Sequence, residues 1–168
     1  MRAARRAPLL AVLCAGFVAG SIDIGAAALI NGLSPVTILH SIASGLLGKA
    51  SFSDGAPAAL LGLGLQWGMS IIIAAVFVTA ANKFHALARR WVSSGIGYGV
   101  VIFLVMNYVL VPLSAAPWNP WKRHFSTDKL IENLVAMILF GLIVAFCARY
   151  FAFRSMADGH ESTPASPV

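Results

Sequence analysis

Four apolar stretches, each about 20 residues or longer, constrain the fold of this chain more than any other feature. A helix of that length crosses the hydrocarbon core of a bilayer, which is about 30 Å thick. Of the 168 residues, 59% are hydrophobic and only 11% are charged, too few charges to cover a soluble surface. The sequence therefore predicts an all-α integral membrane protein, a four-helix bundle whose spans are residues 8–30, 56–81, 91–113 and 130–153.

A fifth apolar stretch, residues 35–47, is too short to cross the bilayer. Ser34 followed by Pro35 is typical of a helix start, and Gly48 is typical of a helix stop. At helical spacing one side of this stretch carries Leu39, Ile42, Ala43 and Leu46, and the other carries Thr37, His40, Ser41 and Ser44. We expect a short amphipathic helix that lies in the outer interface of the membrane or re-enters it.

The basic residues near the span ends predict the orientation. Four of them fall on one side of the membrane, namely Lys49, Lys122, Arg123 and Lys129. Eight fall on the other side, namely Arg2, Arg5, Arg6, Lys83, Arg89, Arg90, Arg149 and Arg154. Because cytoplasmic loops carry the excess of Lys and Arg, both termini are predicted to be cytoplasmic and the short helix to face outward.

Two regions follow from these spans, a transmembrane domain over residues 1–154 and a tail over residues 155–168. The tail is rich in Ser, Pro and small polar residues and has little apolar surface to bury, so we expect it to be disordered in the cytoplasm. The net charge of +6 does not indicate nucleic acid, because the basic residues lie in small groups between the apolar runs. The expected partners are the lipid bilayer and either further copies of the chain or another membrane protein.

Asp23 lies alone inside the first apolar run, where a carboxylate costs a few kcal/mol unless it is paired or protonated. The other spans each place one polar side chain in the same outer half, namely Gln66, Asn107 and Glu132. If these side chains face inward, they form one polar layer that is open to the outside and closed below by apolar packing. Such a layer can bind a proton or a cation.

Structural roles compete with this hypothesis. Gln66 and Asn107 can simply hydrogen-bond neighbouring helices, as polar groups in membrane bundles commonly do. Glu132 can mark the start of its helix, where an acid is favoured by the helix dipole. His40, on the polar side of the short helix, can titrate or bind a metal, or can simply be a solvated residue on the outer face.

The sequence contains no HExxH, GxSxG or P-loop motif and no paired carboxylates on a polar segment. We therefore expect no enzymatic activity, no metal and no cofactor, although an intramembrane enzyme with dispersed catalytic residues is not excluded by motifs alone.

Several segments together resemble a family of small proteobacterial inner-membrane proteins with no assigned function. They are Gly16-Phe-Val-Ala-Gly-Ser-Ile-Asp-Ile-Gly, Ser34-Pro-Val-Thr-Ile-Leu, Gly97-Tyr-Gly-Val-Val-Ile-Phe and Asn107-Tyr-Val-Leu-Val-Pro-Leu. Pro112-Leu113 and the Pro-Trp loop after them are also similar to YagU-type inner-membrane proteins. The resemblance covers residues 9–153 and implies a bacterial inner membrane and a four-helix fold. It implies no activity, ligand or catalytic residue.

These observations favour an accessory or structural component of the inner membrane. The alternative is a proton- or cation-linked transporter or channel subunit built on Asp23.

Overall fold

The structure is a computed structural model that describes the backbone of residues 2–115 and 127–160 and the side chains of residues 8–115 and 127–151. Every regular element in these ranges is helical, which confirms the predicted all-α class. The longer helices are α1 (Arg2–Asn31), α3 (Gly55–Lys83), α5 (Trp91–Val105) and α7 (Thr127–His160). The shorter elements are α2 (Pro35–Leu47), the 3₁₀ helix η1 (Gly48–Phe52), α4 (His85–Arg89), the π-helix η2 (Met106–Leu110) and α6 (Val111–Leu113).

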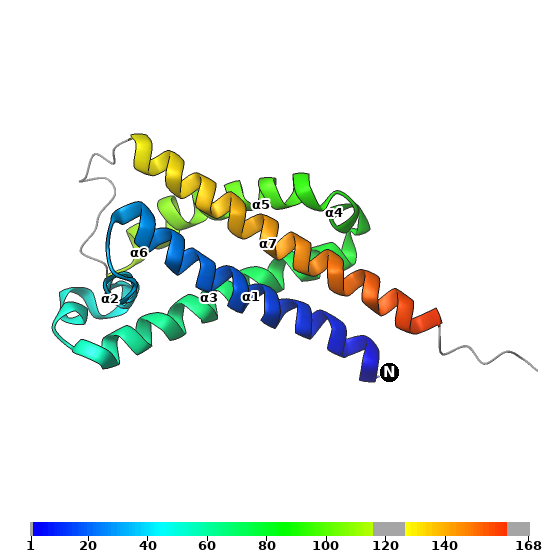
Figure 1. Ribbon diagram of the computed structural model, residues 1–168, viewed down its shortest axis with the longest axis horizontal. Coiled ribbons are helices and arrows are strands. Elements are labelled where there is room, and N and C mark those ends of the chain that lie inside the picture. Colours follow the sequence, from blue (N-terminus) through cyan, green and yellow to red (C-terminus); the bar gives the residue numbers. More distant parts are fainter. Residues whose placement is uncertain (1, 116–126, 161–168) are drawn as a thin grey trace, which may run out of the picture.

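Four helical stretches of the described chain are long and apolar enough to cross a membrane, as predicted: Pro8–Asn31, Gly55–Lys83, Trp91–Leu113 and Thr127–Phe151. The protein is therefore a multi-pass membrane protein. Successive spans run in opposite directions, so the start of α1 and the end of α7 lie at the same end of the molecule (Figure 1). We call this the terminal end. The opposite end, the α2 end, carries α2, η1, α6 and the start of α7.

Helix α7 continues through His160, so residues 155–160, predicted to be disordered, are helical. The sequence has no Gly or Pro between residues 142 and 158, and extending an existing helix costs little compared with starting one. Residues 161–168 of the predicted tail and residues 116–126, which include the predicted outer loop around Trp118, lie outside the described residues.

Glycines set the closest approach of α5 and α7. A Cβ atom on Gly99 would lie 2.5 Å from the Met137 carbonyl oxygen and 2.6 Å from the Ile138 Cα, so the two backbones are in direct contact there. Gly95 and Gly141 pack in the same crossing. Small residues four apart allow this approach in a membrane bundle. The same spacing at Gly64 and Gly68 also predicts a helix contact, and that prediction is wrong within the described chain, because no other described segment lies within 4 Å of a Cβ atom placed at either position.

The terminal half of the bundle is tightly packed and apolar. One row of α1, spaced by four residues, contributes Ala11, Ala15 and Ala19, each at most 1% exposed. Val144, Ala145 and Ala148 of α7 belong to the same core, together with Phe77 of α3. Small side chains bring α1 and α7 close together, which lets dispersion contacts hold the helices without a hydrophobic driving force from water.

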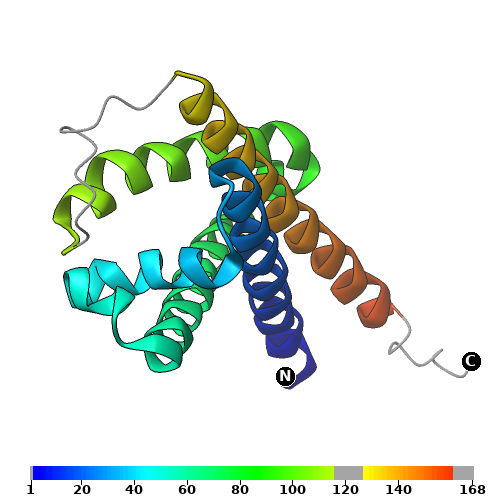
Figure 2. The same cartoon turned by 60° about the vertical axis from the view of Figure 1, so that its left-hand side comes forward.

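Helix α2 begins and ends where the sequence predicts. The Ser34 hydroxyl accepts a hydrogen bond from the Thr37 backbone N–H, Pro35 occupies the first turn, and Gly48 ends the helix with φ of +60°. Figure 2 shows α2 lying across the direction of α1 instead of alongside it. At its far end, the Ala115 N–H donates to the Gly45 carbonyl at 2.9 Å, which ties α2 to the end of the third span. Its angle to the membrane plane stays a prediction.

The polar side of α2 needs one correction, because Ser44 is buried together with Ile38 and Ala43. Leu46 is 63% exposed, a position in which lipid can cover it. Ser44 lies inside because its hydroxyl is satisfied within the helix, donating to the Ser41 carbonyl at 2.6 Å, and because small side chains permit close packing. The backbone of Leu39 approaches α3 so closely that Gly62 has no room for a Cβ atom.

Candidate functional site: a polar cavity at Asp23

The crossing of α1 and α3 positions Asp23. A Cβ atom on Gly20 would lie 2.6 Å from the Ser70 hydroxyl oxygen, and one on Gly16 would lie 2.8 Å from the Ile71 Cα, so the two helices are in close contact here. The two helices are antiparallel. Asp23, about one turn after Gly20, is therefore level with Gln66, about one turn before Ser70. Gly16 and Gly20 are small residues four apart, a spacing that predicts a close helix contact. That contact is present, and the polar pair Asp23 and Gln66 lies about one turn from it.

The Gln66 side-chain amide Nε2 donates a hydrogen bond to the Asp23 Oδ2 at 2.7 Å. Gln66 is only 6% exposed and Asp23 is partly buried, so this pair lies inside the bundle. A second contact supports the same crossing: the Trp67 indole N–H donates to the Ser21 hydroxyl at 3.3 Å. Because the Gln66 amide donates to Oδ2 of Asp23, the Oδ1 atom of the same carboxyl can interact with a different group.

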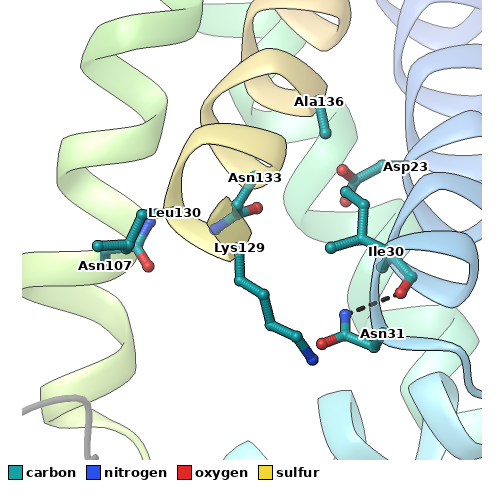
Figure 3. Close-up of a pocket in the computed structure, with 9 residues that line it drawn as sticks. Asp23, Ile30, Asn31, Asn107, Lys129, Leu130, Asn133 and Ala136 are labelled. Carbon is teal, nitrogen blue, oxygen red and sulfur yellow. Dashed lines mark hydrogen bonds between the residues drawn. The ribbon is translucent and has the colours of Figure 1, made fainter. Parts of the chain in front are cut away.

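That carboxyl borders a cavity of about 120 Å³. The cavity is lined by Asp23, Ala27, Ile30, Asn31, Asn107, Lys129, Leu130, Asn133 and Ala136. On α1 the lining positions follow the helical spacing of one face, and on α7 Lys129, Asn133 and Ala136 do the same. Figure 3 shows the Asp23 carboxylate pointing from α1 toward α7, with Asn133 between it and Asn107 in this view.

Asn107 comes from the π-helix η2 in the third span. The N–H of Val111 bonds to the Met106 carbonyl, five residues back, so the helix is locally widened. Pro112 explains the position of this feature, because its ring lacks an N–H and clashes with the carbonyl four residues earlier. The sequence predicts a single span over residues 91–113, and the structure differs from that prediction in having a π segment within the span. π segments of this kind are frequent at functional sites.

Glu132 does not belong to the cavity. It is exposed on α7, and the next residue, Asn133, lines the cavity instead. Successive helical positions differ by about 100° around the axis, so a shift of one residue moves a side chain to another face. Asn31 and Lys129 also line the cavity and were not predicted. Their spacing offered a signal, since Asn31 and Ala27 follow Asp23 at steps of four and Lys129 precedes Asn133 by four.

His40 lies outside this cavity. Its Nε2 atom is buried and has no hydrogen-bond partner among the residues that the structure describes, and its ring packs edge-on against Phe52 with centroids 6.2 Å apart. The residue is thus partly buried and not a solvated group on the outer face. Whether it titrates stays a prediction. Among the described residues, no three His, Cys, Asp or Glu side chains lie together so that they could hold a metal ion.

Among the described residues, the lining of the cavity is exposed at the α2 end. Asn31 and Lys129 at that end are exposed, whereas Ala19 and Gly20, on the other side of Asp23, are buried. Eight residues separate Asp23 from Asn31, a rise of about 12 Å. Chemically, the site offers one carboxyl, several amides and one ammonium group.

Comparison of the chain with protein-family models, curated proteins and solved structures finds no match.

Proposed function

We propose that this chain is an accessory or structural component of the bacterial inner membrane that works with a membrane-protein partner or with further copies of itself. The positive-inside rule supports an orientation with both termini in the cytoplasm and α2 outside. The resemblance to small proteobacterial inner-membrane proteins supports the choice of membrane.

One observation carries the proposal: the polar cavity ends at Asp23. Beyond Asp23 the same rows of α1 and α7 consist of buried apolar residues, including Ala19, Ala15 and Val144. A solute that enters the cavity from the α2 end therefore meets tight packing about halfway through the bundle. A chain of this form supports a partner more readily than it conducts a solute alone.

The third span supports the same proposal. Most of its large side chains are exposed, among them Val92, Ile96, Val101, Leu104, Val105 and Tyr108. In the described chain this span packs mainly on α7, with Tyr98 reaching α3 through a hydrogen bond from its hydroxyl to the Ile73 carbonyl at 2.7 Å. The exposed side can be covered by lipid or by another membrane protein.

The second candidate is a subunit of a proton- or cation-linked transporter or channel. It is favoured by the carboxyl of Asp23, which a proton or cation can reach from the α2 end. The full chain in proteoliposomes separates the two candidates. We expect proton and K⁺ flux no greater than in protein-free vesicles, and cross-links to a second polypeptide in native membranes. Flux in the wild type would support the transporter and overturn the accessory role if Asp23→Asn abolishes it. The exposed control Glu132→Gln should then retain the flux.

The orientation has its own test. With Cys14 and Cys147 replaced by Ser, a cysteine at position 114 should react with an impermeant thiol reagent added to intact cells, and one at position 155 should react only after lysis. The opposite pattern would reverse the proposed orientation.

A further inference from the structure

The cavity at Asp23 contains one acid and one base, held apart. Asp23 lies at its inner end and Lys129 at the exposed end, on α1 and α7 respectively. Lys129 and Ala136 both line the cavity on α7 and are seven positions apart, which corresponds to a rise of about 10 Å. Figure 3 shows the Lys129 side chain extending away from Asp23, toward Asn31. The carboxyl is bonded to Gln66 and not to this ammonium group.

The side chains that line the cavity favour a ligand that donates hydrogen bonds. Asn31 uses its Nδ2 to donate to the Ala27 carbonyl at 2.8 Å, and Asn107 donates in the same way to the Phe103 carbonyl at 2.9 Å, so each amide has its carbonyl oxygen to offer to a ligand. At the inner end, the Asp23 carboxyl suits a primary ammonium group, which has three N–H donors and accepts no hydrogen bond.

The positive charge of Lys129 at the exposed end of the cavity disfavours the entry of a simple cation. A cation that enters must pass Lys129, and a simple anion is repelled by Asp23. The two charged residues sum to zero, so a ligand with one positive and one negative group matches both ends. Apolar positions, including Ala27, Ile30 and Leu130, line the walls between them and suit a short hydrocarbon link.

We propose that this cavity binds a zwitterion with a primary ammonium group against Asp23 and a phosphate or carboxylate against Lys129. A volume of about 120 Å³ suits a group of headgroup size, since one water occupies about 30 Å³ of liquid. The same chemistry occurs in a phosphatidylethanolamine headgroup and in a soluble zwitterion such as phosphoethanolamine. The proposal rests on the one-sided cavity used above, but its test measures neither flux nor assembly, so either proposal can fail alone.

The test is lipid competition on the detergent-solubilised full chain, measured by native mass spectrometry. Phosphatidylethanolamine and phosphatidylcholine with identical acyl chains are offered together. Choline carries the same charge but has no N–H, so we expect about a tenfold preference for the ethanolamine lipid, in line with hydrogen bonds to a charged group. Asp23→Asn should bring the preference close to one.

Lys129→Gln provides a second, independent variant, because Lys129 is exposed and its replacement should not disturb folding. It should weaken the retention of both lipids several-fold and leave their ratio unchanged, since both carry the phosphate. The matched controls are Glu132→Gln, an exposed acid outside the cavity, and Lys49→Gln, an exposed base in η1. Both should behave as the wild type does.

Soluble phosphoethanolamine distinguishes the two sources. If it displaces the bound lipid and phosphocholine does not, the site also accepts the free zwitterion. If neither displaces the lipid, the occupant is the lipid headgroup. A wild-type chain that binds both lipids equally, or a preference that Asp23→Asn leaves intact in a folded protein, would overturn the proposal.

Discussion

The two halves of the bundle are built on the same helix faces with different side chains. Along α1, residues at steps of four line the cavity in one half, at Asp23, Ala27 and Asn31, and form the core in the other half, at Ala11, Ala15 and Ala19. Helix α7 shows the same change, from Lys129 and Asn133 to Phe140, Val144 and Ala148. Small apolar residues let the helices pack closely, whereas polar residues leave space that a ligand or water can occupy.

The polar half of the bundle depends on the close packing of the helices for its geometry. The tight crossings at Gly20 and at Gly99 fix the helices relative to one another. This arrangement brings Asp23 of α1 within hydrogen-bond distance of Gln66 of α3. Changes in the two halves should therefore have different effects on stability, and three substitutions test this, beginning with the largest expected effect.

Gly99→Ala should destabilise the bundle most. The added methyl would lie within 2.6 Å of the α7 backbone at Ile138, and neither helix has a flexible side chain there that could move. Overpacking of this kind costs about 1–3 kcal/mol. Unfolding of the full chain in bicelles measures the change. Gly97→Ala is the matched control, because nothing lies within 4 Å of that position and alanine favours the helix by up to about 1 kcal/mol. Equal stability of the two variants would contradict the close α5–α7 contact.

Asp23→Leu should have the next largest effect. It removes the acceptor of the Gln66 amide and leaves a buried donor without a partner, at a cost of about 1–3 kcal/mol. Asp23→Asn keeps an acceptor oxygen at the same position and should cost less than about 1 kcal/mol. The same unfolding measurement compares them, with Glu132→Leu as a control at an exposed acid. If Leu is tolerated as well as Asn, the hydrogen bond contributes nothing to the polar half.

Tyr98→Phe should have the smallest effect. Its hydroxyl donates to the Ile73 carbonyl at 2.7 Å and links α5 to α3 inside the apolar half. Hydrogen bonds between membrane helices contribute about 0.6 kcal/mol on average, because the same groups also find partners in the unfolded state within the membrane. Tyr98→Leu also removes the ring contact with Phe77, whose centroid lies 5.0 Å away, and should cost more. A loss from Tyr98→Phe as large as that from Gly99→Ala would mean that polar contacts, and not close packing, hold this half together.

Much of the secondary structure could be predicted because it depends on local properties. Apolar length set the four spans, and Ser34, Pro35 and Gly48 set the limits of α2. The contact of Asp23 with Gln66 could be predicted because a buried acid needs a partner and few polar residues share its depth. Its functional role, like that of His40, stays a prediction.

The failures concern rotation about helix axes. Glu132 was expected in the polar layer, and its neighbour Asn133 lies there instead, since one residue turns the helix by about 100°. Gly64 and Gly68 have the same spacing as Gly95 and Gly99 but contact nothing, while Gly62 packs against α2. Depth in the membrane follows from counting residues, but the direction of a side chain around the helix does not.

The amino-acid sequence is enough to establish the class of protein, the four spans, the limits of α2 and the isolated acid in the first span. These properties follow from the transfer of apolar side chains into lipid and from the local geometry of helix ends. The pairing of the helices cannot be read from the sequence in this way, and neither can the set of polar residues that share the cavity with Asp23. Lipid solvates every apolar face equally, so helix pairing depends on close packing between residues far apart in the chain.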